Sequence, residues 1–310
     1  MNVAEHPFLW GMKPEHIEII ARGARERSFE PREVIFRQGE PASRIYLIQQ
    51  GKIGLEAHGL DGRHLDLQTL EGGEVLGWSW LFPPFVWTLQ AHAIEPTRVT
   101  VLDGAHVLVA CEENHELGYA VMRRVANLVV QRLESVSRQI LATPVGEDLE
   151  ETTSMSAWTD KPVPNAIAEH PFLLGLKKPH LDALAALAMQ VKFAPEELIY
   201  HAGDPANRFY LIQRGNIALE ADSPSGRKLL HIISNGEALG WSWLYEPYQW
   251  HFDARAIDDT TAIFFYGTRL RELCEADHDL GYELMKRITH VVIRRLHATR
   301  KQLLAAAKVC

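Results

Sequence analysis

The chain contains the same sequence twice, and this duplication limits its fold to those that fit within about half of its length. EHPFLWGMKPEHIE, which begins at Glu5, returns as EHPFLLGLKKPHLD from Glu169, at an offset of 164 residues (169 − 5 = 164). After a deletion of one residue the offset becomes 163, so that Trp78 corresponds to Trp241 (241 − 78 = 163). A repeat of this length indicates the tandem duplication of a whole domain.

The repeat also defines where the domains begin and end. We predict a first domain over residues 1–142 and a second domain over residues 167–310. The segment between them, residues 143–166, is rich in Pro, Ser, Thr and acidic residues and has no sustained apolar period. Such a composition is typical of a linker.

Composition narrows the class of protein. Of the 310 residues, 46% are hydrophobic and 23% are charged, as is typical of soluble globular proteins. The N-terminus MNVAEHPFLW lacks a charged leader followed by an apolar run, and no segment has the ~18 uninterrupted apolar residues that cross a bilayer. The three cysteines form neither a CxxC pair nor an even-numbered disulfide framework. We therefore expect a cytoplasmic protein that does not enter membranes, and its net charge of −8 disfavours nonspecific binding to DNA.

Within each copy the apolar period changes from helical to strand-like and back. Apolar residues recur at helical spacing over residues 14–24 and again over residues 179–189. In the first copy, strand-like runs follow at 33–36, 44–49 and 52–57, with turn residues at Gly39, Gly51, Asp61-Gly62 and Gly72-Gly73. Each copy then ends in a long amphipathic helical pattern, from Val121 to Ile140 and from Leu284 to Leu303.

This order of elements resembles the cyclic-nucleotide-binding domain. That family includes the effector domains of catabolite-activator and FNR-type regulators, the regulatory subunits of protein kinase A and the cytoplasmic domains of gated ion channels. The resemblance covers about Glu5 to Ala142 and Glu169 to Ala305, and it implies a mainly β fold with flanking helices (α+β). Each copy is expected to be a jelly-roll-like β-roll closed by a long amphipathic helix. The most specific shared residues are Gly39/Gly203, Tyr46/Tyr210, Gly51/Gly215 and Gly77/Gly240.

The resemblance implies that a ligand binds at the family's phosphate-binding cassette, and there this chain departs from the family pattern. The family cassette reads Gly-Glu-x-Ala-Leu and then Pro-Arg-Ala-Ala; its Glu accepts a hydrogen bond from the ribose 2′-hydroxyl and its Arg pairs with the cyclic phosphate. Here Trp78 and Trp241 stand at the Glu position, and Phe85 and Tyr248 stand at the Arg position. An indole offers no in-plane acceptor and an aromatic ring cannot neutralise a phosphate. We therefore expect neither copy to bind cAMP or cGMP in the usual way.

Six of the eight tryptophans lie in the two cassettes, and three interpretations are open. The indoles fill the former nucleotide pocket, or they line an open pocket for a planar ring such as a nucleobase, a nucleoside or the nicotinamide of NAD(P)H, or they form an exposed patch that docks a protein. The candidate ligand-binding residues are Gly77, Trp78, Ser79, Trp80, Phe85, Trp87 and His92 in the first copy, and Gly240, Trp241, Ser242, Trp243, Tyr248, Trp250, Asp253 and Arg255 in the second.

Polar residues of the second cassette make it the favoured binding copy. Arg255 is the nearest candidate partner for an anion, and His92 occupies the equivalent place in the first copy. His251 and Asp253 occur in the second copy only, where the first copy has Thr88 and Gln90. If one copy alone binds a ligand, we expect it to be the second.

Catalysis and a metal site are not expected. The chain has no Ser-His-Asp order, no GxSxG or HExxH motif and no Gly-rich nucleotide loop. Cys111 and His115, repeated as Cys274 and His278, are four residues apart and are predicted to share a helix face. They offer two ligands per copy where a structural zinc site takes four. We interpret them as a buried thiol and a helix-capping histidine.

The sequence therefore predicts a non-enzymatic regulatory or sensor module that binds a planar, nucleoside-like ligand or a protein partner. In the activator family the closing helix joins two effector domains, which implies that the two copies here pair through their final helices as a pseudo-dimer; further self-association is open. We expect no DNA partner, because no helix-turn-helix pattern follows either copy. Two alternatives stand beside this prediction: an accessory subunit of a redox complex of the NAD(P)-linked hydrogenase type, and an activator/FNR-family regulator that does bind a cyclic nucleotide.

Overall fold

The structure is a computed structural model that describes residues 3–58, 64–142, 162–224 and 226–306. Contacts between residues divide the chain into two compact units, Met1–Val125 and Ala126–Cys310. The predicted turn at Asp61-Gly62, Cys310 and residues 143–161 of the predicted linker lie outside the described residues. No helix in the described part of the chain is long and apolar enough to cross a membrane.

Unit 1 contains a roll of short strands. They are β1 (Arg25–Phe29), β2 (Val34–Phe36), β3 (Arg44–Gln50), β4 (Lys52–His58), β5 (His64–Glu71), β6 (Val75–Leu76), β7 (Gln90–Ala93) and β8 (Thr97–Asp103). The strands form two four-stranded sheets, in the orders β1-β8-β3-β6 and β2-β7-β4-β5, and neighbouring strands are antiparallel. This arrangement is the predicted β-roll.

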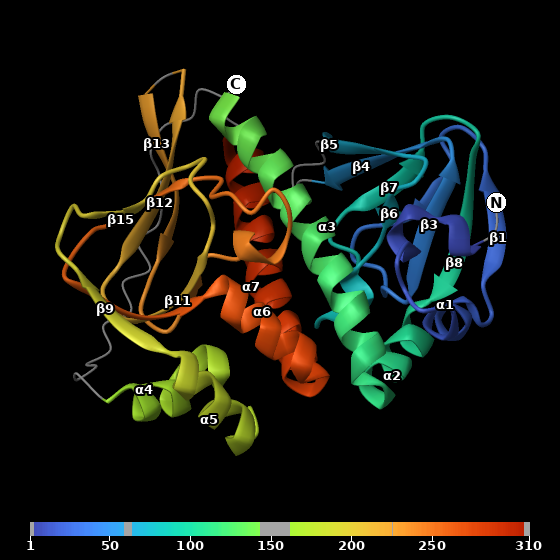
Figure 1. Cartoon of the computed structure of the whole chain (residues 1–310). Helices are drawn as coiled ribbons and strands as arrows, with labels where there is room; N and C mark the ends of the chain where they lie inside the picture. Colours follow the sequence, from blue (N-terminus) through green and yellow to red (C-terminus); the bar gives the residue numbers. More distant parts are fainter. Residues whose placement is uncertain (1–2, 59–63, 143–161, 225, 307–310) are drawn as a thin grey trace. The chain divides into compact units, whose positions relative to one another are not determined.

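Unit 2 repeats the roll strand for strand (Figure 1). Its strands are β9 (Met189–Phe193), β10 (Leu198–Tyr200), β11 (Arg208–Arg214), β12 (Ile217–Ser223), β13 (Gly226–Ile233), β14 (Ala238–Leu239), β15 (Asp253–Ala256) and β16 (Thr260–Tyr266). The two sheets have the orders β9-β16-β11-β14 and β10-β15-β12-β13. The duplication in sequence is therefore a duplication of the fold.

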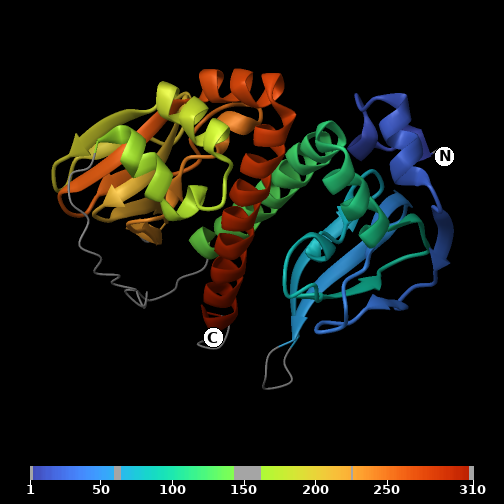
Figure 2. The same ribbon diagram turned by 90° about the horizontal axis from the view of Figure 1, so that it is seen from below.

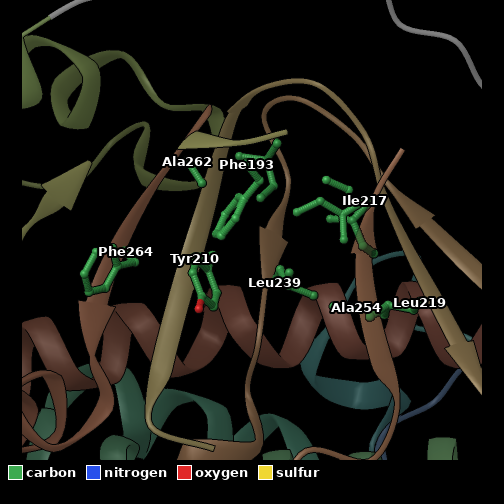
Figure 3. Close-up of a cluster of buried hydrophobic side chains, with 11 residues drawn as sticks. Phe193, Tyr210, Ile217, Leu219, Leu239, Ala254, Ala262 and Phe264 are labelled. Atoms are coloured by element: carbon green, nitrogen blue, oxygen red, sulfur yellow. The ribbon is translucent and has the colours of Figure 1, made fainter. Parts of the chain in front are cut away.

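The interior of the second roll is filled from both sheets. Tyr210 of β11 and Phe264 of β16 come from one sheet, and Leu219 of β12 and Ala254 of β15 from the other (Figure 3). All of these side chains are buried. Because the two inner faces pack against each other, burial of their apolar surface stabilises both sheets together.

Helices flank each roll. They are α1 (Pro14–Ala21), α2 (Gly104–Glu113), α3 (His115–Ala142), α4 (Val163–Glu169), α5 (Lys178–Leu187), α6 (Gly267–Ala276) and α7 (His278–Ala306). The long closing helices α3 and α7 confirm the amphipathic patterns seen in the sequence. From Ala126 onward α3 belongs to unit 2, where Val130, Leu133 and Ile140 are buried. Unit 2 thus consists of the second copy and the end of the first copy's closing helix.

Three helix boundaries differ from the prediction. The helix predicted over residues 14–24 ends at Ala21, because Gly23 adopts a positive φ of 78° that a helix cannot continue through. The helix predicted over residues 179–189 ends at Leu187, since strand β9 begins at Met189. The last residues of the predicted linker are helical, because α4 begins at Val163.

The prediction that Cys111 and His115 share a helix face was wrong. Asn114 has an extended backbone (φ −134°) that separates α2 from α3, and Asp277 separates α6 from α7 in the same way, at the sharp turn visible in Figure 2. The Asn114 side chain accepts a hydrogen bond from the amide of Leu117 (3.1 Å), so the helix-capping role assigned to the histidine belongs to Asn114. The cysteines Cys111 and Cys274 are buried, as expected of a buried thiol.

A buried histidine fixes the entry to each roll. In unit 2 the Nδ1 atom of His170 accepts a hydrogen bond from the amide of Phe172 (3.2 Å), which leaves Nε2 as the donor to the carbonyl oxygen of Ile212 (3.1 Å). His6 makes the same two contacts in unit 1. Both nitrogens are used in the neutral form, and burial lowers the pKa of His170 from 6.5 to about 4.

Acid is therefore expected to destabilise unit 2 through His170. The unfolded chain takes up a proton near pH 6.5 and the folded chain near pH 4, so the stabilisation is complete above pH 6.5 and is lost as pH falls toward 4. The loss amounts to about 3 kcal/mol at pH 4. Urea unfolding between pH 7.5 and pH 4 measures it. His170→Gln, which keeps one acceptor and one donor, should reduce the loss by about this amount and leave the part due to His231 and His297, whose pKa values are also lowered by burial. An unchanged pH slope in that variant would contradict the assignment.

Candidate ligand-binding site

The candidate site lies in the segment that follows β6 and ends with β7 in unit 1, and that follows β14 and ends with β15 in unit 2, called the cassette below. Each cassette, residues 77–93 and 240–256, begins with a glycine at positive φ, 93° at Gly77 and 85° at Gly240. A short 3-10 helix follows, over Ser79–Leu81 in the first copy and Ser242–Leu244 in the second.

The third tryptophan of each cassette packs into the roll. Trp87 stacks on Phe36 with ring centroids 3.9 Å apart, and Trp250 stacks on Tyr200 at 4.0 Å. A Cβ atom placed on Gly77 would lie 2.8 Å from the Trp87 ring. The cassette glycine therefore leaves the space that the indole fills, and both indoles are buried.

The other cassette tryptophans are buried as well. Trp80 and Trp243 pack under the first residue of α2 and α6, where a Cβ atom on Gly104 or Gly267 would lie 2.7 Å from them. Trp241 lies beneath the guanidinium group of Arg295 of α7, whose Cζ atom is 4.5 Å from the ring centroid. Since Trp78 is also buried, all six indoles are placed as packing residues rather than as an exposed patch.

Phe85 and Tyr248, which stand where the family has arginine, occupy strained backbone positions at φ 55°. The Phe85 side chain is 43% exposed. Tyr248 is half-buried, and the guanidinium group of Arg271 packs over its ring, with Cζ 4.4 Å from the ring centroid. The structure therefore puts two rings near the surface at the positions where the family holds the phosphate.

His92, Asp253 and Arg255 do not join the other candidate residues. Burial alternates along both β7 and β15, so that the alanines face the interior and these three side chains face outward. Arg255 pairs with Glu220 (Nε to Oε2, 3.5 Å), and Asp253 pairs with Arg227. Nδ1 of His92 lies 2.5 Å from Oε1 of Glu56. The expectation that Arg255 serves as the anion partner at the cassette is therefore not supported by its position.

A small cavity remains at the second cassette. About 20 Å³ is open to the centre of a water-sized sphere, which is room for about one water molecule. Aromatic and aliphatic side chains form most of its wall. The lining residues are Val130, Leu133, Glu134, Tyr200, Leu219, Leu239, Gly240, Trp241, Ser242, Trp250, His251 and Phe252.

A chain of polar groups crosses the wall of this cavity. Nδ1 of His251 lies 3.2 Å from the hydroxyl of Ser242, and Nε2 lies 2.9 Å from Oε1 of Glu134, near the end of α3. Burial, and after it the charge of Glu134, raises the pKa of the Tyr245 hydroxyl, which therefore remains a protonated donor. These four side chains combine hydrogen-bond donors with one carboxylate.

Two buried polar atoms at or beside the second cassette have no hydrogen-bond partner among the described residues. They are Oε1 of Glu134, in α3, and Nε1 of Trp243. Glu134 is within ion-pair distance of His251, but the geometry is not that of a hydrogen bond. Trp80, the equivalent of Trp243 in the first copy, does donate, to the carbonyl of Gly77 (3.2 Å). Buried polar atoms in native proteins are paired with protein groups, water or ligands, so these atoms mark a place where a ligand can make hydrogen bonds.

Sequence reasoning did not identify Glu134, Tyr200 or Tyr245. The first copy has Phe82 in place of Tyr245 and Phe36 in place of Tyr200. A comparison of the copies could therefore have identified the two additional hydroxyl groups of the second copy. Glu134 gave no such signal, because it belongs to the closing helix of the first copy and reaches the cavity only through the packing of α3 within unit 2.

One group of potential metal ligands occurs in the described part of the chain. Side-chain atoms of His180, Asp277 and Asp279 all lie within 4.8 Å of one another. Asp277 already accepts a hydrogen bond from the amide of Leu280 (3.1 Å), and Nζ of Lys177 lies 3.5 Å from Asp279. Helix capping and an ion pair account for this group.

Solved structures similar to this chain include regulatory subunits of protein kinase A. One is the regulatory subunit of a cAMP-independent protein kinase A from Trypanosoma cruzi, bound to guanosine (17% identity, TM-score 0.33, 89% of this chain and 82% of that chain). Another is the regulatory domain of Toxoplasma gondii protein kinase A with cAMP (11% identity, TM-score 0.32, 90% of this chain and 91% of that chain). A putative cyclic nucleotide-binding protein from Geobacter metallireducens is 25% identical (TM-score 0.39) and covers 45% of this chain and 100% of its own.

No curated protein matches the chain. The sequence profile of the cyclic nucleotide-binding domain matches twice, at residues 26–114 and 190–277. Each match covers most of one roll and includes its cassette. Because the two matches together span more than half of the chain, the protein belongs to the cyclic nucleotide-binding domain family.

Proposed function

We propose that this chain is a non-enzymatic regulatory module whose second cassette senses a planar, uncharged, nucleoside-like ligand. The observation that carries the proposal is the cavity of unit 2, whose largely apolar wall includes Ser242, His251 and Glu134, with Oε1 of Glu134 buried and without a hydrogen-bond partner among the described residues. Binding sites combine an apolar wall with a few converging polar groups. The first copy has Phe82 where the second has Tyr245 and Phe36 where the second has Tyr200, and we propose that the rings of the first cassette serve to fill it.

A cyclic nucleotide bound in the family's manner does not suit this site. The arginine that pairs with the phosphate is replaced by Tyr248, and Arg255 faces away and is paired with Glu220. The carboxylate of Glu134 lies in the cavity wall, where it would repel a phosphate. A ligand without negative charge avoids this repulsion and can still stack on the indole and phenol rings.

Binding requires the site to change shape, which suits a regulatory role. The cavity holds about one water molecule, whereas pockets for small ligands occupy about 300 Å³ or more. A ligand therefore enters only when Trp250 or the end of α3 moves, and it stabilises that second arrangement.

The buried residues of the end of α3 and of α7 also support the proposed pairing of the closing helices within one chain. Our proposal includes a cytoplasmic location and no DNA partner.

Equilibrium dialysis with radiolabelled ligands tests the ligand class. We expect adenosine to bind saturably, with one site per chain, and to change the intrinsic tryptophan fluorescence. We expect cAMP and cGMP to bind at least about 100-fold more weakly, because the charged partner of the phosphate is missing. Tight, saturable cAMP binding would refute the proposal. If no nucleoside and no NAD(P)H binds, the exposed ring of Phe85 makes docking to a protein the better-supported role.

A further inference from the structure

We propose that Glu134, although it lies in the closing helix of the first copy, is the acid of the second copy's site. It supplies the carboxylate that accepts a hydrogen bond from the 2′- or 3′-hydroxyl group of the ligand, in place of the glutamate that the cassette lacks at Trp241. This inference rests on the proposed function and adds to it the residue that selects the ligand.

Position is the first argument. Glu134 follows Val130 and Leu133 along α3, and all three line the cavity together with Trp241 and Trp250 of the cassette. The Glu134 side chain is 21% exposed, so its carboxylate is largely withdrawn from water. A carboxylate removed from water needs hydrogen-bond donors, and Oε1 of Glu134 has none with hydrogen-bond geometry among the described residues.

The second argument is the orientation of the carboxylate. Nδ1 of His251 forms a hydrogen bond with the hydroxyl of Ser242, as acceptor or as donor according to the tautomer. Nε2 of the same ring lies 2.9 Å from Oε1 of Glu134. With Nδ1 as the acceptor, Nε2 carries the proton and faces the acid. His251 then holds the carboxylate in place at the cavity wall through this contact of 2.9 Å. Its remaining lone pairs are available to a ligand.

The third argument is the difference between the copies. The residue that corresponds to Glu134 in the second closing helix is His297 (297 − 134 = 163), and burial lowers its pKa to about 4. The residue that corresponds to His251 is Thr88. Neither the acid nor its histidine partner is therefore duplicated, although the indoles are. A group required only for packing the rings would be expected at both cassettes.

Binding of two ligands to the wild-type full chain and to three variants tests the inference. The ligands are adenosine and 2′,3′-dideoxyadenosine, which lacks the 2′- and 3′-hydroxyls but keeps the 5′-hydroxyl and the base. The variants are Glu134→Gln, which keeps the shape of the side chain, and Glu134→Asp, which keeps the charge. Glu283→Gln is the matched control, because Glu283 is a paired acid of α7 that lies outside the cavity lining. Thermal unfolding identifies any variant that is simply less stable.

We expect the wild-type chain to bind adenosine at least about tenfold more tightly than dideoxyadenosine, because a hydrogen bond to a charged group contributes about this factor to affinity. Glu134→Gln should weaken adenosine binding by about the same factor and leave dideoxyadenosine unaffected, while Glu134→Asp should retain part of the preference and Glu283→Gln all of it. Equal losses for both ligands, or no loss for either, would overturn the role of Glu134 and leave the proposed function intact. Failure of adenosine and of every other nucleoside tested to bind the wild-type chain would overturn both.

Discussion

Trp250→Ala is expected to lower the free energy of unfolding of unit 2 by about 3–5 kcal/mol, the range for removing a large aromatic side chain from a core. The Trp250 ring is buried, stacks on Tyr200 at 4.0 Å and lies against Gly240, where a Cβ atom would come within 2.9 Å of it. None of these neighbours can move into the space left by the ring without rearranging the cassette. Urea unfolding followed by circular dichroism at 222 nm measures the change.

The first copy supplies the matched comparison. Trp87→Ala should cost unit 1 a similar amount, because Trp87 stacks on Phe36 in the same geometry. The conservative variant Trp250→Phe should recover most of the loss, since it keeps a ring on Tyr200. A cost below about 1 kcal/mol for Trp250→Ala would show that the indole is not a packing residue and would reopen the interpretation of the cassette as an exposed patch.

The fold could be predicted from the sequence because its signals are local and occur twice. Glycines at Gly51 and Gly215 both adopt positive φ beside a tight turn, and the closing helices follow an apolar period of three and four residues. The breaks at Asn114 and Asp277 were missed, since an apolar period continues across a single extended residue. Their side chains, an amide and a carboxylate, are good helix caps and were the available sign of a break.

The candidate site could be predicted only in part, because its members come from distant elements. The tryptophans were identified from their repetition, and all six prove to be buried. His92, Asp253 and Arg255 were assigned by their nearness in sequence, but an alternating strand turns every second side chain away from the interior. Glu134 reaches the second cassette through packing of α3, which no local pattern encodes.

The two cassettes therefore share their packing and differ in their chemistry. The indoles, the positive-φ glycine and the aromatic ring after proline are repeated. The hydroxyl of Tyr245, the imidazole of His251 and the carboxylate of Glu134 are found at the second cassette, where the first has Phe82 and Thr88. Repeated rings are accounted for by the stability of the roll, whereas the polar groups present once suggest a function that only one copy performs.

The packing part of this account can be separated from backbone strain with two glycines of unit 1. Gly77 and Gly39 have nearly the same φ, 93° and 87°, but a Cβ atom on Gly77 would lie 2.8 Å from the Trp87 ring, while one on Gly39 would meet nothing within 4 Å. Gly39→Ala should therefore cost only the strain of a left-handed residue, about 1–2 kcal/mol.

Gly77→Ala should cost that strain and, in addition, about 1–3 kcal/mol for overpacking, because the indole it displaces is stacked on Phe36 and the carbonyl oxygen of Arg44 closes the other side at 3.1 Å. Urea unfolding of the two variants in the same buffer gives the difference directly. If Trp87 holds the cassette in place, combining Gly77→Ala with Trp87→Ala should cost less than the sum of the two single changes, since the added methyl group occupies part of the space that the ring leaves. Additive costs would mean that the glycine and the indole act independently, and the cassette would then be shaped by its backbone rather than by the ring packed against it.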